Sequence, residues 1–165
     1  MCNQTAHKMA WLIMAHTADQ FSRNMYRGTA EMYALDPKAL AWSKTLLVRC
    51  YNGINTHTAV TATTQADGRA KQARIGDRVW ILMTLMHSEA VEDQEACVAG
   101  FAGLRDDAVA AGLDAAPFDN FYNYANMHLK VVQQWGRFPH RNAILGRAST
   151  AEEQVGLSDG SIPAF

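Results

Sequence analysis

The chain has 165 residues, enough for one domain, and a domain of this size buries roughly 70% of its unfolded surface on folding. Its 48% hydrophobic and 19% charged residues are ordinary for a globular protein and exclude an intrinsically disordered chain. The formal net charge of -1 provides no basic field to attract a phosphate backbone, so we expect no nucleic-acid partner.

The first predicted element is a helix over residues 5–27. It is apolar nearly all round from Met9 to Ala15, which is typical of a central buried element rather than a surface helix. Gly28 is expected to end it. Because such a helix needs neighbours on every side, formation of a homo-oligomer is one way to cover it.

Asp36 followed by Pro37 predicts the N-cap and first turn of a second helix, which stops at residues 52–53. From residue 54 to 76 the chain is threonine-rich and polar without a sustained period. A long surface loop or insertion is therefore predicted over 54–76. Asp77 is then expected to cap a short buried helix with the sequence "RVWILMTLM".

Three further helices complete the predicted chain. Ser88 is the expected N-cap of one, with acidic side chains in its first turns. Asp119 opens the next, whose buried stripe includes His128 as a hydrogen-bonded core residue. A capping box at residues 149–152 or 150–153 begins a short last helix. With no predicted strand, the fold class is all-α, built from antiparallel helical hairpins in a single domain over the whole chain.

Cysteine usage and hydropathy exclude further classes of protein. The three cysteines are far apart and odd in number, so the sequence predicts neither a disulfide framework nor a paired-cysteine metal site. This pattern favours the reducing cytoplasm. No segment reaches the ~20 apolar residues that cross a membrane. The apolar run at 9–15 is short, is flanked by His7 and His16 and continues as a helix, which does not favour a secretion signal. We therefore expect a cytoplasmic protein without a membrane partner.

Three polar blocks carry a resemblance to a known family. They are "DQFSRNMYRGT" at 19–29, "LMHSEAVEDQE" at 85–95 and "WGRFPHRNAILGRASTAEE" at 135–153. Over about residues 11–157 the chain resembles the domain-of-unknown-function 924 family, found in bacteria and fungi. The resemblance implies an all-helical, tetratricopeptide-like fold with no established activity. It also implies a further N-terminal helix, rich in tryptophan and phenylalanine, that this sequence is expected to lack.

The second block contains the candidate acid–base residues His87 and Glu89. A histidine titrates near neutral pH, and a neighbouring carboxylate can tune it. His140, in the third block, is the other catalytic candidate. A histidine that merely closes a helix end is the more common case. No recognised ligand spacing or cofactor motif joins these residues, so neither a metal nor a cofactor is expected.

The first block pairs Asp19 with Arg23 four residues later, in the order that favours a helical ion pair. Arg27 lies on the Arg23 side, and Asn24 lies on the adjoining face. These residues form either an anion clamp or a polar seam that ties the helix to its neighbours.

In the third block, Gly136 and Pro139 end a helix and force a tight turn. Arg137, His140, Arg141 and Asn142 project from this stiff turn. The arginines either satisfy helix ends and carboxylates such as Asp19, Glu89 or Asp93, or recognise a small anion at little entropic cost.

Two functions follow from these blocks. In the first, the blocks converge on one pocket that binds a small anionic molecule, with acid–base chemistry as a further option. Its expected lining is Asp19, Arg23, Asn24, Arg27, His87, Glu89, Arg137, His140, Arg141 and Asn142. In the second, the protein is a non-catalytic, tetratricopeptide-like interaction scaffold and the same residues form a structural polar network. Binding is favoured, because so many arginines and histidines lie near one another in a chain with sparse charge.

Overall fold

The computed structural model of the chain describes residues 4–51 and 68–165, and every regular element in these two ranges is a helix. The elements are α1 (Gln4–His16), a π-helical turn (Thr17–Phe21), α2 (Ser22–Met25), a 3-10 turn (Ala30–Tyr33), α3 (Asp36–Tyr51), α4 (Gly68–Met86), α5 (Val91–Ala110), α6 (Ala116–Trp135), a 3-10 turn (Pro139–Arg141) and α7 (Ala151–Asp159). The predicted all-α fold class is confirmed.

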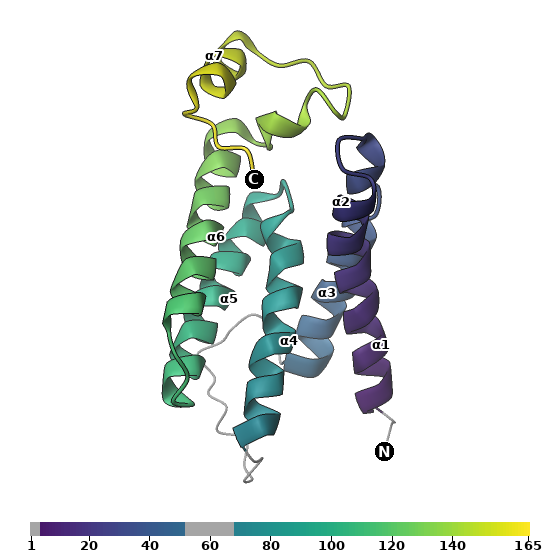
Figure 1. Cartoon of the computed structure of the whole chain (residues 1–165), viewed down its shortest axis with the longest axis vertical. Helices are drawn as coiled ribbons and strands as arrows, with labels where there is room; N and C mark the ends of the chain where they lie inside the picture. Colours follow the sequence, from purple (N-terminus) through teal and green to yellow (C-terminus); the bar gives the residue numbers. More distant parts are fainter. Residues whose placement is uncertain (1–3, 52–67) are drawn as a thin grey trace.

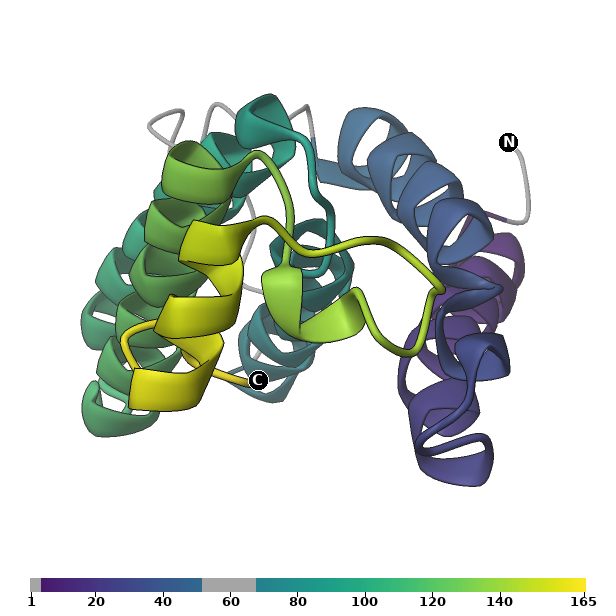
Figure 2. The same cartoon turned by 90° about the horizontal axis from the view of Figure 1, so that it is seen from above.

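Successive long helices run antiparallel and pack side by side (Figure 1). Helix α4 lies at the centre, with α5 and α6 on one side and α1 and α3 on the other. The predicted helical hairpins are therefore present. Seen from above, residues 136–165 extend across the end of the bundle where α4 gives way to α5 (Figure 2). This end also carries the π-helical turn and α2.

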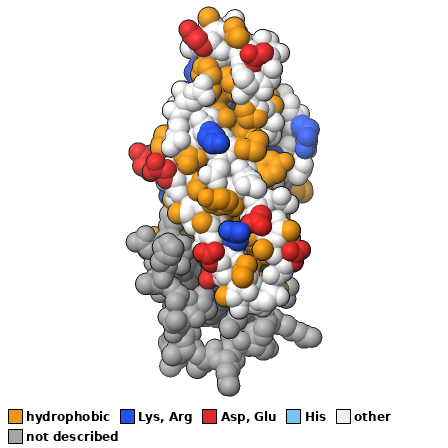
Figure 3. Space-filling model, turned by 90° about the vertical axis from the view of Figure 1, so that its left-hand side faces the viewer, with side chains coloured by type: hydrophobic (Ala, Val, Ile, Leu, Met, Phe, Trp, Pro, Cys, Tyr) orange, Lys and Arg blue, Asp and Glu red, His pale blue; other side chains and the backbone are white. Residues whose placement is uncertain are grey.

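Helix α1 is peripheral, which corrects the prediction of a central helix buried on every side. Its residues Leu12 and Ala15 are buried, but Met9 and Ile13 are 51% and 56% exposed. On the α6 side of the molecule, hydrophobic side chains are interspersed with isolated charged ones (Figure 3). The oligomer that would cover α1 stays a prediction.

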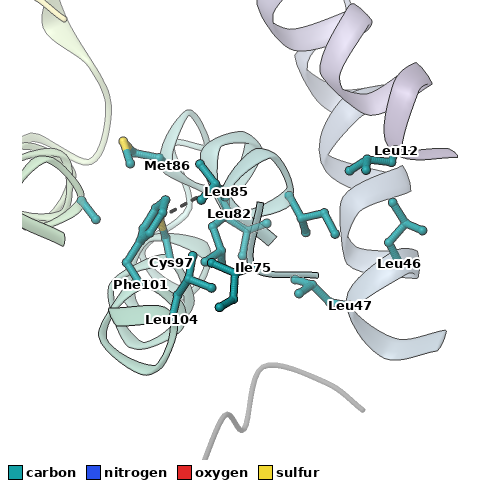
Figure 4. Close-up of a cluster of buried hydrophobic side chains, with 13 residues drawn as sticks. Leu12, Leu46, Leu47, Ile75, Leu82, Leu85, Met86, Cys97, Phe101 and Leu104 are labelled. Carbon is teal, nitrogen blue, oxygen red and sulfur yellow. Dashed lines mark hydrogen bonds between the residues drawn. The ribbon is translucent and has the colours of Figure 1, made fainter. Parts of the chain in front are cut away.

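The main core joins α1, α3, α4, α5 and α6. Its buried side chains are mostly aliphatic and include the aromatic ring of Phe101 (Figure 4). Phe101 is fully buried and stacks on Phe121 of α6. Cys97 is also buried in this core, where burial raises the pKa of its thiol and keeps it protonated. Cys97 therefore packs as a small apolar side chain, and its protonated thiol is a poor nucleophile.

The predicted loop over residues 54–76 is wrong for its last part, because α4 begins at Gly68. Residues 52–67 lie outside the described part of the chain. Asp77 is consequently inside a helix and does not cap one. The stretch after Gly68 is rich in alanine, lysine, arginine and glutamine, which are strong helix formers that need no apolar period.

Two predicted caps before α3 and α5 are also wrong. The carbonyl of Leu35 accepts the first amide bonds of α3, so Asp36 is already a helical residue and its side chain is free for other contacts. Helix α5 begins at Val91, with Ala90 as its N-cap residue. Ser88 lies two residues before this N-cap, and its hydroxyl accepts a hydrogen bond from the Ala90 amide.

Helix α6 begins at Ala116, three positions before the predicted start at Asp119. Pro117 in the first turn fixes a helical backbone angle and needs no amide partner there, which favours the earlier start. The last predicted cap is confirmed at Thr150, whose hydroxyl accepts the amide of Glu153 in a full capping box. Of the two capping boxes that the sequence allowed, the structure therefore contains the one at residues 150–153.

The contact between α4 and α5 predicts opposite effects for two glycine-to-alanine substitutions. A Cβ atom at Gly100 would overlap the buried side chain of Leu82, whereas a Cβ atom at Gly76 meets no neighbour. Gly100→Ala should therefore lower the free energy of unfolding by about 1–2 kcal/mol. The matched control Gly76→Ala should raise it by about 0.5–1 kcal/mol. Urea denaturation measures both, and equal effects would contradict the packing described.

Candidate functional site

The three polar blocks of the sequence meet at one end of the bundle. Arg23 comes from α2, His87 from the α4–α5 junction, and Arg141 from the 3-10 turn after α6. Two carboxylates link them: Asp19 contacts Arg23 and His87, and Asp36 contacts both arginines. We call this group, completed by a tyrosine ring beneath the arginines, the end cluster. Its members are Asp19, Arg23, Tyr33, Asp36, His87 and Arg141.

The π-helical turn brings Asp19 into the end cluster. A π turn holds one residue more than an α turn and widens the helix locally, a feature that is frequent at functional sites. Asp19 is 1% exposed. Its Oδ1 atom lies 2.7 Å from Nδ1 of His87 and 3.3 Å from Nη2 of Arg23. The ion pair predicted between Asp19 and Arg23 is therefore present, and it is shared with a histidine.

The Asp19–His87 pair holds a charged carboxylate against a neutral imidazole. Burial raises the pKa of Asp19, but hydrogen bonding and charge from His87 and Arg23 outweigh it and leave that pKa below its ordinary value. Burial lowers the pKa of His87, and the two arginines add to this against the opposing effect of Asp19. A neutral His87 then donates from Nδ1 to Asp19, which leaves the lone pair on Nε2. Within the described residues, no group bonds to Nε2.

Asp36 serves two arginines with a single oxygen. Its Oδ2 atom lies 2.7 Å from Nη2 of Arg23 and 3.5 Å from Nη1 of Arg141. Its other oxygen, Oδ1, is buried and has no partner among the described residues. Burial raises the pKa of Asp36 above its ordinary value although both arginines lower it. Asp36 is therefore a poorly satisfied anion.

Arg141 is the least satisfied charge of the end cluster. It is 6% exposed, and its Cζ atom lies 4.7 Å from the ring centroid of Tyr33 and 4.4 Å from that of Phe138. No atom of the described residues accepts a hydrogen bond from its guanidinium, and its Nε atom is buried. Burial, with Arg23 nearby, lowers the pKa of Arg141 to about 10. A buried guanidinium with five donors ordinarily finds acceptors, so this one is costly.

Two further histidines and the ring of Phe165 adjoin the end cluster. His128 bonds through Nδ1 to the carbonyl of Tyr124, as expected for a core histidine, and stacks on Phe165 with ring centroids 3.6 Å apart. Burial lowers the pKa of His128 to about 3. Burial and the charge of Arg141 lower the pKa of His140 to about 4. Both imidazoles are therefore neutral near pH 7.

Arg137 and Asn142 converge on Glu153 of α7 rather than on the end cluster. The two nitrogens Nε and Nη2 of Arg137 each lie 2.7 Å from a carboxylate oxygen of Glu153, and Nδ2 of Asn142 lies 3.2 Å from it. Glu153 is 2% exposed and also accepts the amide of Thr150. The hydrogen bond from Arg137 is the main reason that the pKa of Glu153 falls to about 2. These residues join α7 to the turn after α6.

Glu89 holds the other end of the same turn. Its oxygens lie 2.7 and 2.9 Å from the two terminal nitrogens of Arg147, and Oε1 also accepts the amide of Phe138 at 2.7 Å. Burial raises the pKa of Glu89, but these bonds outweigh it and keep the carboxylate charged. Both oxygens are engaged, so the geometry gives the predicted acid–base role of Glu89 no support.

Asn24 and Arg27 lie outside the end cluster. Both are exposed, and Oδ1 of Asn24 accepts a hydrogen bond from Arg27 at 3.2 Å. His140 contacts the aromatic rings, with ring centroids 5.7 Å from Phe138 and 5.8 Å from Phe165, and its Nδ1 atom is buried without a partner in the described part of the chain.

Sequence reasoning missed three members of this region. Tyr33 carries no motif that distinguishes it from other tyrosines. Asp36 was interpreted as a cap, because a carboxylate at a helix start usually serves the helix. Arg147 stands within the third block, and its distance in sequence from Glu89 concealed their pairing.

The chain belongs to the family described as bacterial protein of unknown function, DUF924, whose sequence profile matches residues 1–161. The predicted family is therefore confirmed. A solved structure of a protein of unknown function from Agrobacterium tumefaciens is similar to this chain, with 28% sequence identity and a TM-score of 0.62. The match covers 93% of this chain and 69% of that chain. No curated protein matches the sequence.

Across residues 4–51 and 68–165, no helix has both the length and the hydropathy needed to cross a membrane. Over the same two ranges, no three histidine, cysteine, aspartate or glutamate side chains gather in a way that could hold a metal ion.

The Glu89–Arg147 pair predicts a stability effect that no exposed carboxylate should share. Glu89→Gln removes the charge that faces Arg147 and weakens the bond to the Phe138 amide. The free energy of unfolding should fall by about 2 kcal/mol, or about 4–8 °C in Tm. Glu92→Gln, an exposed neighbour on α5, should change Tm by less than about 1 °C. Calorimetry compares them, and equal Tm values for both variants would contradict the anchoring role.

The lowered pKa of His128 predicts a pH-dependent stability. Because the folded state favours the neutral ring, the contribution is fully present above pH 6.5 and declines as the pH falls toward 3. Wild-type protein should therefore lose on the order of 3 kcal/mol between pH 6.5 and 4 through this group. In His128→Gln, urea unfolding at a series of pH values should show a shallower decline. An unchanged slope would show that His128 is not the titrating group.

Proposed function

We propose that the end cluster binds a small anionic molecule through the guanidinium groups of Arg141 and Arg23. The observation that carries this proposal is the state of Arg141, which is almost fully buried while no described residue accepts a hydrogen bond from its guanidinium. A charge of this kind costs several kcal/mol to bury without partners. An anion that accepts from the guanidinium would offset that cost and would be bound tightly in return.

The surroundings of Arg141 favour anion binding in two further ways. The rings of Tyr33 and Phe138 hold the guanidinium in place, so binding loses little side-chain entropy. Arg23 also lies over the Tyr33 ring, 5.2 Å from its centroid, so the two positive charges are close together. Burial lowers the pKa of Arg141, and repulsion by Arg23 adds to this effect. An anion bound between the two guanidinium groups would relieve that repulsion.

His87 adds a group that can exchange a proton with the bound molecule. Asp19 fixes the imidazole through Nδ1, and the free lone pair on Nε2 can accept a hydrogen bond or a proton from a hydroxyl group of the ligand. Carboxylate–histidine pairs of this type orient a general base. His87 is therefore the strongest candidate for acid–base chemistry, and Glu89 is not, because both of its oxygens are engaged.

The interaction scaffold is the second candidate function, and two ion pairs favour it. Arg137–Glu153 and Arg147–Glu89 are each bonded through two nitrogens to one carboxylate, and these ion pairs need no ligand, although Nε of Arg147 is buried without a partner among the described residues. A scaffold of this kind gives no reason to bury Arg141 without acceptors. Arg141 is thus the residue on which the two functions differ.

Thermal unfolding in sodium phosphate and sodium acetate, against sodium chloride at equal ionic strength, tests the proposal. Arg141→Met keeps the apolar stem between the two rings and removes the charge. Its Tm in chloride should equal or exceed that of the wild type by a few degrees, because a costly buried charge is gone. The extra stabilisation by phosphate or acetate should disappear in this variant.

Arg137→Met is the matched control, because it removes an arginine of the same turn that already has its partner. Its Tm should fall in every buffer, and its response to phosphate and acetate should remain. The proposal fails if wild-type protein shows no stabilisation by either anion beyond that of chloride. It also fails if Arg141→Met is destabilised like Arg137→Met, since Arg141 would then be a structural strut.

A further inference from the structure

We infer that Asp36 occupies the anion position of the end cluster in the free protein and that a small carboxylate ligand displaces it. This inference rests on the proposed function, and it names both the ligand class and the group that limits access. In these terms Asp36 is an intramolecular competitor. Its head group has the same chemistry as the ligand, a planar singly charged carboxylate.

The bonding of Asp36 is incomplete, which is what displacement requires. Only Oδ2 meets the arginines, at 2.7 Å from Arg23 and 3.5 Å from Arg141, while Oδ1 is buried and has no partner within the described ranges. An ionised carboxylate offers about four acceptor sites, and a buried unpaired oxygen keeps its desolvation penalty. Two-nitrogen contact with an arginine fork would use both oxygens.

Asp36 cannot improve this bonding by itself, because the backbone holds it away from Arg141. It is the first residue of α3, where the Leu35 carbonyl accepts the amides of Lys38 and Ala39. The short aspartate side chain therefore starts from a fixed point and reaches Arg141 only at 3.5 Å. A free carboxylate has no such tether and can align with the Arg141 fork.

The side chain of Asp36 can move into solvent when it is displaced. Its side chain is 18% exposed in the free protein, so a rotation can turn it toward solvent. It stays in the first turn of α3, where the helix dipole favours a negative charge. Burial already raises the pKa of Asp36 in the cluster, so its present position is not a strongly stabilised one. Release therefore costs less than the loss of a fully satisfied ion pair.

Charge favours a singly charged carboxylate over a doubly charged phosphate. In the free protein the charges of Arg23 and Arg141 are balanced by those of Asp19 and Asp36. Both aspartates remain near the site after displacement. A second negative charge on the ligand would be repelled by them, which reduces the gain from the arginines.

Replacing Asp36 tests this inference with acetate as the probe. Asp36→Asn is nearly isosteric but carries no charge, so acetate no longer competes with an internal carboxylate. The acetate concentration that half-saturates the Tm shift should fall about tenfold relative to the wild type. Without acetate, the Tm of this variant should lie below the wild-type value. Glu31→Gln, an exposed acid in the preceding 3-10 turn, is the charge-matched control and should respond to acetate as the wild type does.

The outcomes separate this inference from the proposed function. If acetate stabilises the wild type and Asp36→Asn binds it no more tightly, displacement is wrong and the anion site stands. If phosphate gains more than acetate in Asp36→Asn, the carboxylate assignment is wrong. If neither anion stabilises the wild type or the variant, the anion site itself is wrong. Should Asp36→Asn fail to fold even in acetate, Asp36→Ser gives the same comparison.

Discussion

The ion pair between Glu89 and Arg147 fixes the position of everything that follows α6. Glu89 also accepts the amide of Phe138, so one carboxylate at the α4–α5 junction holds both ends of the segment that contains Arg141. A second pair, from Arg137 to Glu153, attaches α7 to the same turn. These ion pairs bring Arg141 from the C-terminal part of the chain to α2 and α3.

The contrast between paired and poorly paired charges is the basis on which we propose a binding role for one part of this end of the bundle. Arg137 and Arg147 each bond through two nitrogens to a carboxylate, so their charges are paired, although Nε of Arg147 has no partner among the described residues. Arg141 is buried between two aromatic rings and gains only a long contact with Asp36. A helical domain that needed only struts would be more stable with a methionine in its place. Strain of this kind is expected where a protein is prepared for a ligand.

Sequence patterns predicted the fold class, because apolar periodicity is local, and the hypothesis that the three polar blocks converge came from their many arginines and histidines in a chain with sparse charge. These patterns could not assign partners. Asp36 shows the reason: a carboxylate at a helix start serves equally well as a cap or as an ion-pair partner, and only the tertiary structure chooses. His87 and Glu89 are near neighbours in sequence, yet one bonds to Asp19 and the other to Arg147. The first part of α4 was likewise not predicted, because its residues favour a helix but show no apolar periodicity.

NMR of the arginine side chains tests the central claim most directly, namely that Arg141 is held without acceptors until an anion arrives. In nitrogen-15-labelled wild-type protein, the Nε–H signal of Arg141, assigned by its loss in Arg141→Met, can be followed during titration with acetate at constant ionic strength. The account predicts a saturable shift of this signal, while that of Arg137, already bonded to Glu153, stays in place. An Arg141 signal that never moves, or that moves only together with every other arginine, would contradict it.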